Sequence, residues 1–304
     1  MDLHSSIYCK VGMIMIELSI QNIKKRFGKK QVLQGLDITL TPGVYALVGK
    51  NGAGKSTLMQ ILTGILSVDE GEILLNGVKI HPQDSKFSKM IGYLPQDTPI
   101  YKNFSAEKFL CYLATVKGVE KKKRLEKVKQ SLEMVNLEKS SHTLLKNFSG
   151  GMKRRIGIAQ LLLDDSAIII VDEPTVGLDP KERIRFYNIL STISKEKIVI
   201  LSTHIMSDIS FISKEILLMR DGKIIKQGSP QHLLSELEKF VWSVDVTLEE
   251  LPEIQAHFQT GAVKKVDHYV HNIRILSKIK PHEKAKLEIP ELEDLYLYYL
   301  DGEC

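Results

Sequence analysis

The stretch VYALVGKNGAGKSTLMQILTGIL, residues 44–66, gives the strongest indication of the fold class of this chain. It begins with an apolar run typical of a buried strand, continues through a glycine-rich loop, and ends with apolar residues at helical spacing. The loop GKNGAGKST matches the pattern G-x4-G-K-[ST], and a preceding strand and a following helix are the context that this pattern requires. The stretch therefore predicts a phosphate-binding loop rather than a flexible glycine turn.

The residues of this loop have expected roles toward a nucleotide. Small residues let backbone N–H groups converge on the β- and γ-phosphates, Lys55 adds a positive charge, and the Ser56 hydroxyl can bind Mg²⁺. The residues expected to contact the nucleotide are Gly49, Lys50, Asn51, Gly52, Ala53, Gly54, Lys55, Ser56 and Thr57.

A second apolar strand ends in two acids, in AIIIVDEP at residues 167–174. Ligands of parallel α/β sheets bind at the carboxyl ends of the strands, so both acids are expected beside the phosphate loop. We expect Asp172 to hold the Mg²⁺ shell and Glu173 to accept a proton from the attacking water, a role worth about 10²–10⁴ in rate. The alternative is that one of these acids only caps the helix that begins near residue 180.

Two other strand ends carry single polar candidates. His204 ends the strand KIVILSTH and is expected to be catalytic near the γ-phosphate, with a structural hydrogen bond as the alternative. Gln96, in YLPQD, is expected to sense Mg²⁺ or the attacking water through its neutral amide. Taken alone, Gln96 could equally be an ordinary surface residue.

A second glycine-rich turn, NFSGGMKRR at residues 147–155, opens a helix but has no lysine where phosphate would be gripped. A helix N-terminus, the hydroxyl of Ser149 and the backbone N–H groups of Gly150 and Gly151 would suit an anion. We expect Arg154 and Arg155 to be solvated helix residues, with a contribution to the positive field near phosphate as the alternative.

The alternation of strands and helices over residues 16–229 predicts a mostly parallel sheet covered on both faces. A helical insert is expected at about 97–165, with two amphipathic helical stretches before residue 147. Residues 228–230, Gly-Ser-Pro, mark a boundary, and residues 230–304 read as helix, strand, helix and strand. The expected class is an α/β P-loop NTPase with an antiparallel β subdomain, an inserted helical subdomain and a small C-terminal α/β accessory domain, which could instead only cover a sheet edge.

Composition limits the classes of function. A net charge of +5 over 304 residues gives little support to nucleic-acid binding, and three scattered cysteines argue against a disulfide framework or a zinc site. No apolar run approaches the roughly 20 residues that cross a bilayer, so we expect a soluble chain. The single cysteines fit a reducing cytosol, so we expect the chain to be cytoplasmic. The basic stretch EKKKRLEKVKQ, residues 120–130, could bind nucleic acid or lipid head groups, but its Glu–Lys neighbours favour a solvated helix face.

Together these motifs resemble the ATP-binding subunits of ABC transporters. The resemblance spans residues 16–229 and adds GLD, at 177–179, to the motifs above. It implies that ATP and Mg²⁺ are the ligands, that Asp179 belongs to a segment communicating across a dimer, and that Phe27 stacks on adenine, with a core position as the alternative for this phenylalanine. The SGGM turn of one copy would then complete the ATP site of the other, in a homodimer or a heterodimer with a related ATPase.

The resemblance further implies that the helical insert docks on an integral membrane permease, which holds this chain at the inner face of the cell membrane. The stretch SGGMKRRIGIAQ and the ending LEDLYLYYL favour ATPases of drug and bacteriocin-type exporters over importers. Met152 stands where glutamine is commonest in the family, which removes an amide contact but leaves the backbone cradle. The alternative is a soluble relative that acts on a ribosome or nucleic-acid complex. Such relatives carry long heptad arms or two cores in one chain, whereas this sequence has no such arms and one core, so we expect no direct nucleic-acid contact.

Overall fold

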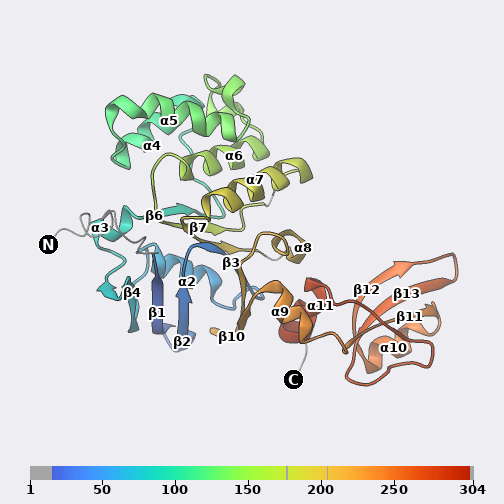
Figure 1. Ribbon diagram of the computed structural model, residues 1–304. Coiled ribbons are helices and arrows are strands. Elements are labelled where there is room, and N and C mark those ends of the chain that lie inside the picture. The colour runs from blue at the N-terminus through green and yellow to red at the C-terminus, as the bar shows by residue number, and fades with distance from the viewer. Residues whose placement is uncertain (1–15, 176, 204, 302–304) are drawn as a thin grey trace.

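The computed structural model describes residues 16–175, 177–203 and 205–301 (Figure 1). The first of its sheets is antiparallel, with the strand order β2-β1-β4-β5. Its bounds are Leu18–Phe27 for β1, Lys30–Leu40 for β2, Glu70–Leu75 for β4 and Val78–Ile80 for β5. This sheet corresponds to the antiparallel β subdomain expected from the sequence.

The central sheet has six strands in the order β10-β9-β3-β8-β7-β6, and every neighbouring pair is parallel except β10 with β9. Its bounds are Gly43–Val48 for β3, Ile91–Leu94 for β6, Ile168–Asp172 for β7, Ile198–Ser202 for β8, Glu215–Arg220 for β9 and Lys223–Gly228 for β10. Strand β7 is buried throughout because both faces of the sheet are covered. The predicted α/β class with a mostly parallel sheet is confirmed.

Helix α2, Lys55–Leu62, lies between these two sheets. Its buried Leu58, Met59 and Ile61 share one core cluster with residues of β1, β2, β7 and β8. The helix begins directly after β3 and the glycine-rich loop, so this packing fixes the loop at the carboxyl end of a central strand. The short helix α3, Ser85–Ser88, precedes β6.

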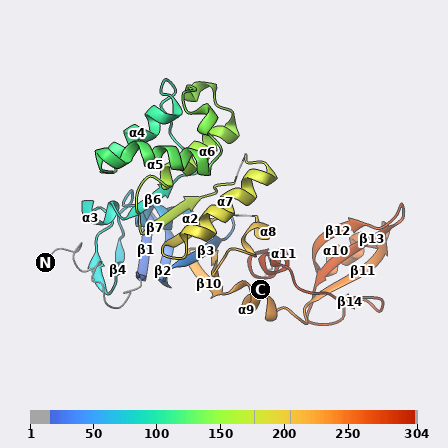
Figure 2. The same ribbon diagram turned by 45° about the horizontal axis from the view of Figure 1, so that its top comes forward.

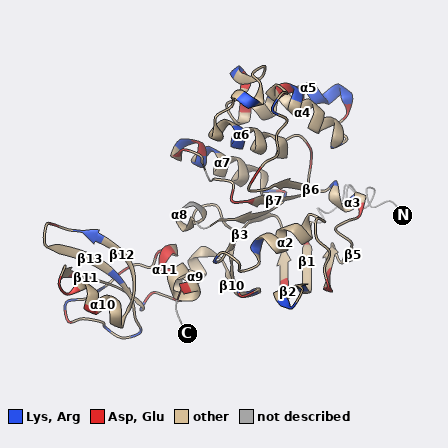
Figure 3. Ribbon diagram, turned by 180° about the vertical axis from the view of Figure 1, so that it is seen from behind, with Lys and Arg blue, Asp and Glu red and all other residues tan. Residues whose placement is uncertain are grey.

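Helices cover the other face of the central sheet (Figure 1). Between β6 and β7 the chain forms α4, Ala106–Val116, α5, Lys121–Met134, and α6, Gly150–Leu161, with short 3-10 turns at Glu138–Ser140 and Leu145–Asn147. Helix α7, Pro180–Ile193, follows β7. The basic stretch forms most of α5, which is blue over much of its length in Figure 3, and its Lys123, Lys127 and Lys129 pair with acids.

The last part of the chain differs from its expected element order. The short helix α8 spans Met206–Ile209, and residues after α9, Pro230–Ser235, form four strands rather than the two expected. The antiparallel order is β12-β13-β11-β14, with bounds Val241–Thr247 for β11, Gln259–Lys265 for β12, Val270–Leu276 for β13 and Lys286–Leu287 for β14. The sequence of strand β12, QTGAVKK, has no regular alternation of apolar and polar residues and therefore does not predict a strand.

Helix α10, Leu251–His257, packs its Leu251 and Ile254 against one face of this C-terminal sheet. Helix α11, Leu292–Tyr296, continues into the π-helical turn η3, Leu297–Asp301. Leu292, Leu295 and Leu300 of this segment join the core cluster of the central sheet, so α11 and η3 connect the C-terminal sheet to the central sheet. In Figures 1 and 2 the C-terminal sheet and helices α4–α6 lie on different sides of the molecule.

In the part of the chain that the structure describes, every helix is too short or too polar to cross a membrane.

Candidate functional site

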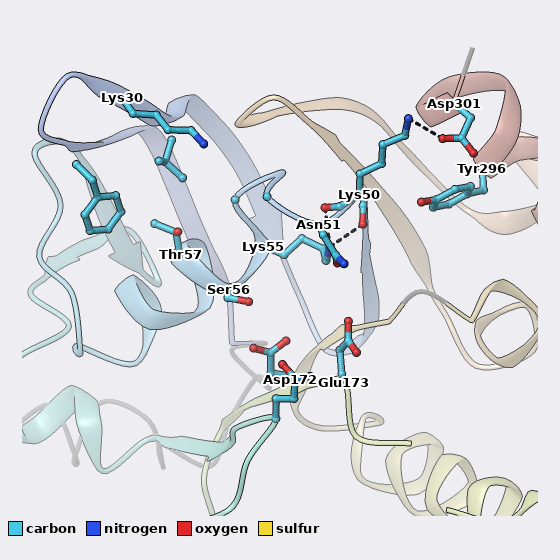
Figure 4. A pocket seen from close by; sticks show the side chains of 16 residues that line it. Lys30, Lys50, Asn51, Lys55, Ser56, Thr57, Asp172, Glu173, Tyr296 and Asp301 are labelled. Atoms are coloured by element: carbon cyan, nitrogen blue, oxygen red, sulfur yellow. Dashed lines mark hydrogen bonds and ion pairs between the residues drawn. The ribbon is translucent and has the colours of Figure 1, made fainter. Parts of the chain in front are cut away.

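A cavity of about 1000 Å³ opens at the carboxyl ends of β3 and β7 (Figure 4). It brings together most of the residues predicted from the sequence: Phe27, Gly49, Lys50, Asn51, Gly52, Gly54, Lys55, Ser56, Thr57, Gln96, Asp172 and Glu173. These residues come from four separate segments, and only the parallel topology brings the loop after β3 beside the acids that end β7. The volume is at the upper end of the range for small-molecule sites.

Glycine is required in the loop for two different reasons. Gly54 precedes α2 with φ +108°, and a Cβ there would approach side-chain atoms of Leu33 and Met219 to 2.8 Å. Gly49 lies so close to the backbone oxygen of Met219 that an added Cβ would come within 2.3 Å of it. Helix α2 has no side-chain cap, so its first N–H groups remain directed at the cavity, where an anion can accept from them.

Ala53 is the exception among the predicted loop residues. Its side chain is buried, and it does not border the cavity. The Ala53 N–H donates to the Lys50 carbonyl at 3.1 Å, and the Ala53 carbonyl accepts from the N–H of Gly222. Ala53 therefore shapes the loop from inside.

The Lys55 ammonium lies folded back on its own loop. Its Nζ donates to the carbonyl oxygens of Gly49 at 2.6 Å and Lys50 at 3.1 Å. Burial lowers the pKa of Lys55 from its ordinary value, and the nearby charges of Glu173 and Asp172 partly oppose that effect. The side chain of Lys55 is thus buried, and no carboxylate of the described residues is bonded to its ammonium, which suits a group that binds phosphate.

Asp172 and Glu173 face the loop from the opposite wall of the cavity (Figure 4). The Ser202 hydroxyl donates to Asp172 Oδ1 at 2.5 Å and accepts from the Glu173 N–H at 3.0 Å, so β8 orients both acids. Glu173 has φ +44°, a left-handed conformation that costs a non-glycine residue about 1–3 kcal/mol. The helix after them is capped by Asp179, so the alternative that Asp172 or Glu173 caps it is wrong.

Ser56, Gln96 and Asp172 border the same cavity. Their hydroxyl, amide and carboxylate oxygens are hard ligands, and Mg²⁺ binds in proteins through one or two carboxylates together with substrate phosphates. The residues present therefore fit Mg²⁺ in company with a nucleotide.

The prediction that Arg154 is a solvated helix residue is wrong, because its side chain is only 7% exposed. Its guanidinium donates to five backbone oxygens where β6 and β7 end: those of Pro95 (2.9 Å), Gln96 (2.7 Å), Asp172 (2.9 Å), Glu173 (2.6 Å) and Pro174 (2.7 Å). Burial lowers its pKa, against the charges of Asp172, Asp97 and Glu173. One side chain of α6 thus holds the backbone of both strand ends.

Arg155, the next residue, is also mostly buried and not solvated. Its Nη1 donates to the carbonyls of Val135 and Asn136, both at 3.2 Å, and lies 3.5 Å from Glu182 Oε1. Arg155 therefore joins α6 to the end of α5 and to α7, away from the strand ends.

The residues of the second glycine-rich turn lie outside the cavity. The Ser149 hydroxyl caps α6 by accepting from the Met152 N–H at 3.2 Å, and Gly150 and Gly151 form the first turn. Asp179 caps α7 by accepting from the Glu182 N–H at 2.9 Å. His204 lies outside the described residues. The roles of these residues toward ATP therefore stay predictions from the sequence.

The remaining cavity walls include residues without a sequence signal. Phe27 is 48% exposed at the cavity, so the alternative of a core phenylalanine is wrong. Lys30 and Val32 of β2 lie on the same side, whereas Tyr296 and Asp301 come from the far end of the sequence. No motif predicts those last two, because only the fold of the C-terminal segment brings them to the loop.

Comparison with known proteins gives consistent matches. The family model described as ABC transporter matches residues 33–176. The lantibiotic transport ATP-binding protein SrtF of Streptococcus pyogenes is 38% identical over 210 residues, which cover 68% of this chain and 89% of that protein. The linearmycin resistance ATP-binding protein LnrL of Bacillus subtilis is 29% identical over 309 residues, covering 92% of this chain and 97% of the relative.

Among solved structures, cbiO1 from Clostridium perfringens, described as part of the ABC transporter complex cbiONQ, superposes with a TM-score of 0.65. It is 26% identical, and the match covers 72% of this chain and 90% of that one.

Proposed function

This chain belongs to the family of ABC transporter ATP-binding proteins, and we propose that ATP binding and hydrolysis in it drive a separate integral membrane permease. Binding of ATP and its hydrolysis follow from the family. The names of the relatives, which refer to lantibiotic transport and linearmycin resistance, support an exporter over an importer. The observation that carries the proposal is that the phosphate loop and the two acids at the end of β7 border the same cavity.

In the proposed mechanism the phosphates lie on the loop between Gly49 and Thr57. Lys55 exchanges its loop carbonyls for phosphate oxygens, and the free N–H groups of α2 add donors. The exposed ring of Phe27 stacks on the adenine, a contact worth about 1–3 kcal/mol per base. Ser56, Gln96 and Asp172 would hold Mg²⁺, which when bound supplies positive charge at the phosphate oxygens.

Hydrolysis needs a positioned base and a closed site. Glu173 accepts the proton of the attacking water, and Arg154 and Ser202 hold the backbone that carries it. Gln96 and His204 are proposed to contact that water or the γ-phosphate. A single copy leaves the cavity open, and the Ser149–Gly151 turn and Asp179 of a second copy would close it.

Docking on the permease is assigned to the helical insert, which would place the chain at the inner face of the cell membrane. Exposed aromatic residues on this insert support that assignment. Tyr101 and Tyr112 are 52% and 43% exposed, and their rings lie 5.5 Å apart beside Phe104. Such an exposed aromatic cluster is typical of a protein-binding surface.

The test is affinity purification of the tagged chain from solubilised membranes, with the Lys55→Ala variant as control for nucleotide dependence. We expect an integral membrane protein to co-purify and a Mg-ATPase activity that the variant lacks. A chain that fractionates with ribosomes and never with a membrane protein would contradict the proposal in favour of the soluble class.

A further inference from the structure

The C-terminal segment contributes a carboxylate to the mouth of the ATP cavity. Asp301 of η3 and Tyr296 of α11 border the cavity, and Asp301 Oδ1 lies 2.6 Å from the ammonium of Lys50 (Figure 4). Lys50 belongs to the phosphate loop itself, where its carbonyl accepts from Lys55. A basic residue in the loop that should attract phosphate is therefore already bonded to an anion of its own chain.

The position of Asp301 is set by several contacts of the segment that carries it. Leu295 and Leu300 are buried in the core beside the central sheet. The Arg220 guanidinium donates to the Tyr299 carbonyl at 3.0 Å, and the Tyr299 hydroxyl donates to Glu236. Asp301 thus lies at the end of a turn that these contacts hold in place beside Lys50.

The Lys50–Asp301 pair itself remains open to solvent. The two side chains are 52% and 38% exposed, and an exposed ion pair contributes little net stability. The bond to Asp301 raises the pKa of Lys50 above its ordinary value of 10.5. Such a pair can exchange partners when an anion of higher charge enters the cavity.

We propose that Asp301 lowers the affinity of the site for ATP, because its carboxylate occupies the Lys50 ammonium and adds negative charge at the mouth of the cavity. This inference rests on the proposed ATP site. Binding energies are reciprocal, so nucleotide on the loop must in turn weaken the contact between η3 and Lys50. The C-terminal segment is then a negative modulator of nucleotide binding, linked to the C-terminal sheet through the 2.6 Å ion pair of Asp294 in α11 with Arg274 in β13.

The test is isothermal titration calorimetry with Mg²⁺ and AMP-PNP, a non-hydrolysable ATP analogue, on the full chain. Asp301→Asn should bind about two- to five-fold more tightly than the wild type, and the difference should shrink at high salt. Asp301→Glu keeps the charge and should retain wild-type affinity. Glu293→Gln removes an exposed carboxylate from the adjoining helix α11, outside the cavity, and should change nothing.

The sign of the effect separates this role from a structural one. A damaged fold would weaken binding, so equal or weaker binding by Asp301→Asn overturns the inference, as does a tightening that is independent of salt. Failure of the wild type itself to bind AMP-PNP would instead contradict the proposed function.

Discussion

Replacing Arg154 with methionine tests how much the strand ends depend on one side chain. Two of its five hydrogen bonds, to the carbonyls of Asp172 and Pro174, are fully buried, and water cannot readily replace them. An unsatisfied buried carbonyl costs about 1–3 kcal/mol, so the two together cost about 2–6 kcal/mol of unfolding free energy. Folded proteins ordinarily have an unfolding free energy of about 5–15 kcal/mol, so the variant should remain folded after most losses of this size.

The same change should act more strongly on catalysis than on binding. Glu173 is held at φ +44° by Arg154 from one side and Ser202 from the other, and without Arg154 its backbone can relax. We expect kcat to fall about 10²-fold, at the low end of the contribution of a positioned base, while the KM for ATP changes less than about threefold. Phosphate release and urea unfolding measure the two effects.

Arg155→Met is the matched control, because Arg155 holds α5 and α7 rather than the strand ends. It should lose stability but keep kcat within a few-fold of the wild type. Arg154→Lys keeps the charge with at most three donors and should be intermediate. A folded Arg154→Met variant with wild-type kcat would refute the positioning role.

Two further outcomes follow from charged groups of the structure. Lys55→Ala should weaken Mg-ATP binding about 10- to 100-fold in calorimetry, because it removes a charge-assisted hydrogen bond to phosphate; unchanged affinity would show that the loop binds without its lysine. Hydrogen bonds from Lys226 and Tyr299 lower the pKa of Glu236 below its ordinary value of 4.5. The melting-temperature advantage of the wild type over Glu236→Gln should therefore be complete at pH 7 and disappear as the pH falls well below 4.5, whereas a difference independent of pH would mean that this carboxylate acts without its charge.

Much of the fold and the cavity could be predicted because local signals agree with the topology. The loop from Gly49 to Thr57 lies between a buried strand and a helix, and the fully apolar run before Asp172 demands a strand covered on both faces. Parallel topology alone then brings both segments to one edge of the sheet.

The parts that escaped prediction depend on contacts between distant segments. Arg154 resembles any arginine of an amphipathic helix until α6 packs across the ends of β6 and β7. Asp301 reaches Lys50 through the docking of η3, a contact across 251 positions that no local pattern records. Strand β12 could not be predicted because its apolar and polar residues alternate only weakly, and it forms a strand through its pairing with β13.

The Glu173→Gln variant tests at once whether two copies enclose ATP and whether Glu173 is the base. Light scattering of this variant with saturating Mg-ATP should give the mass of a dimer, which dissociates when ADP replaces ATP, and hydrolysis should be absent. A variant that binds ATP, remains a monomer and hydrolyses ATP at the wild-type rate would contradict both the two-copy site and the role of Glu173 as the base.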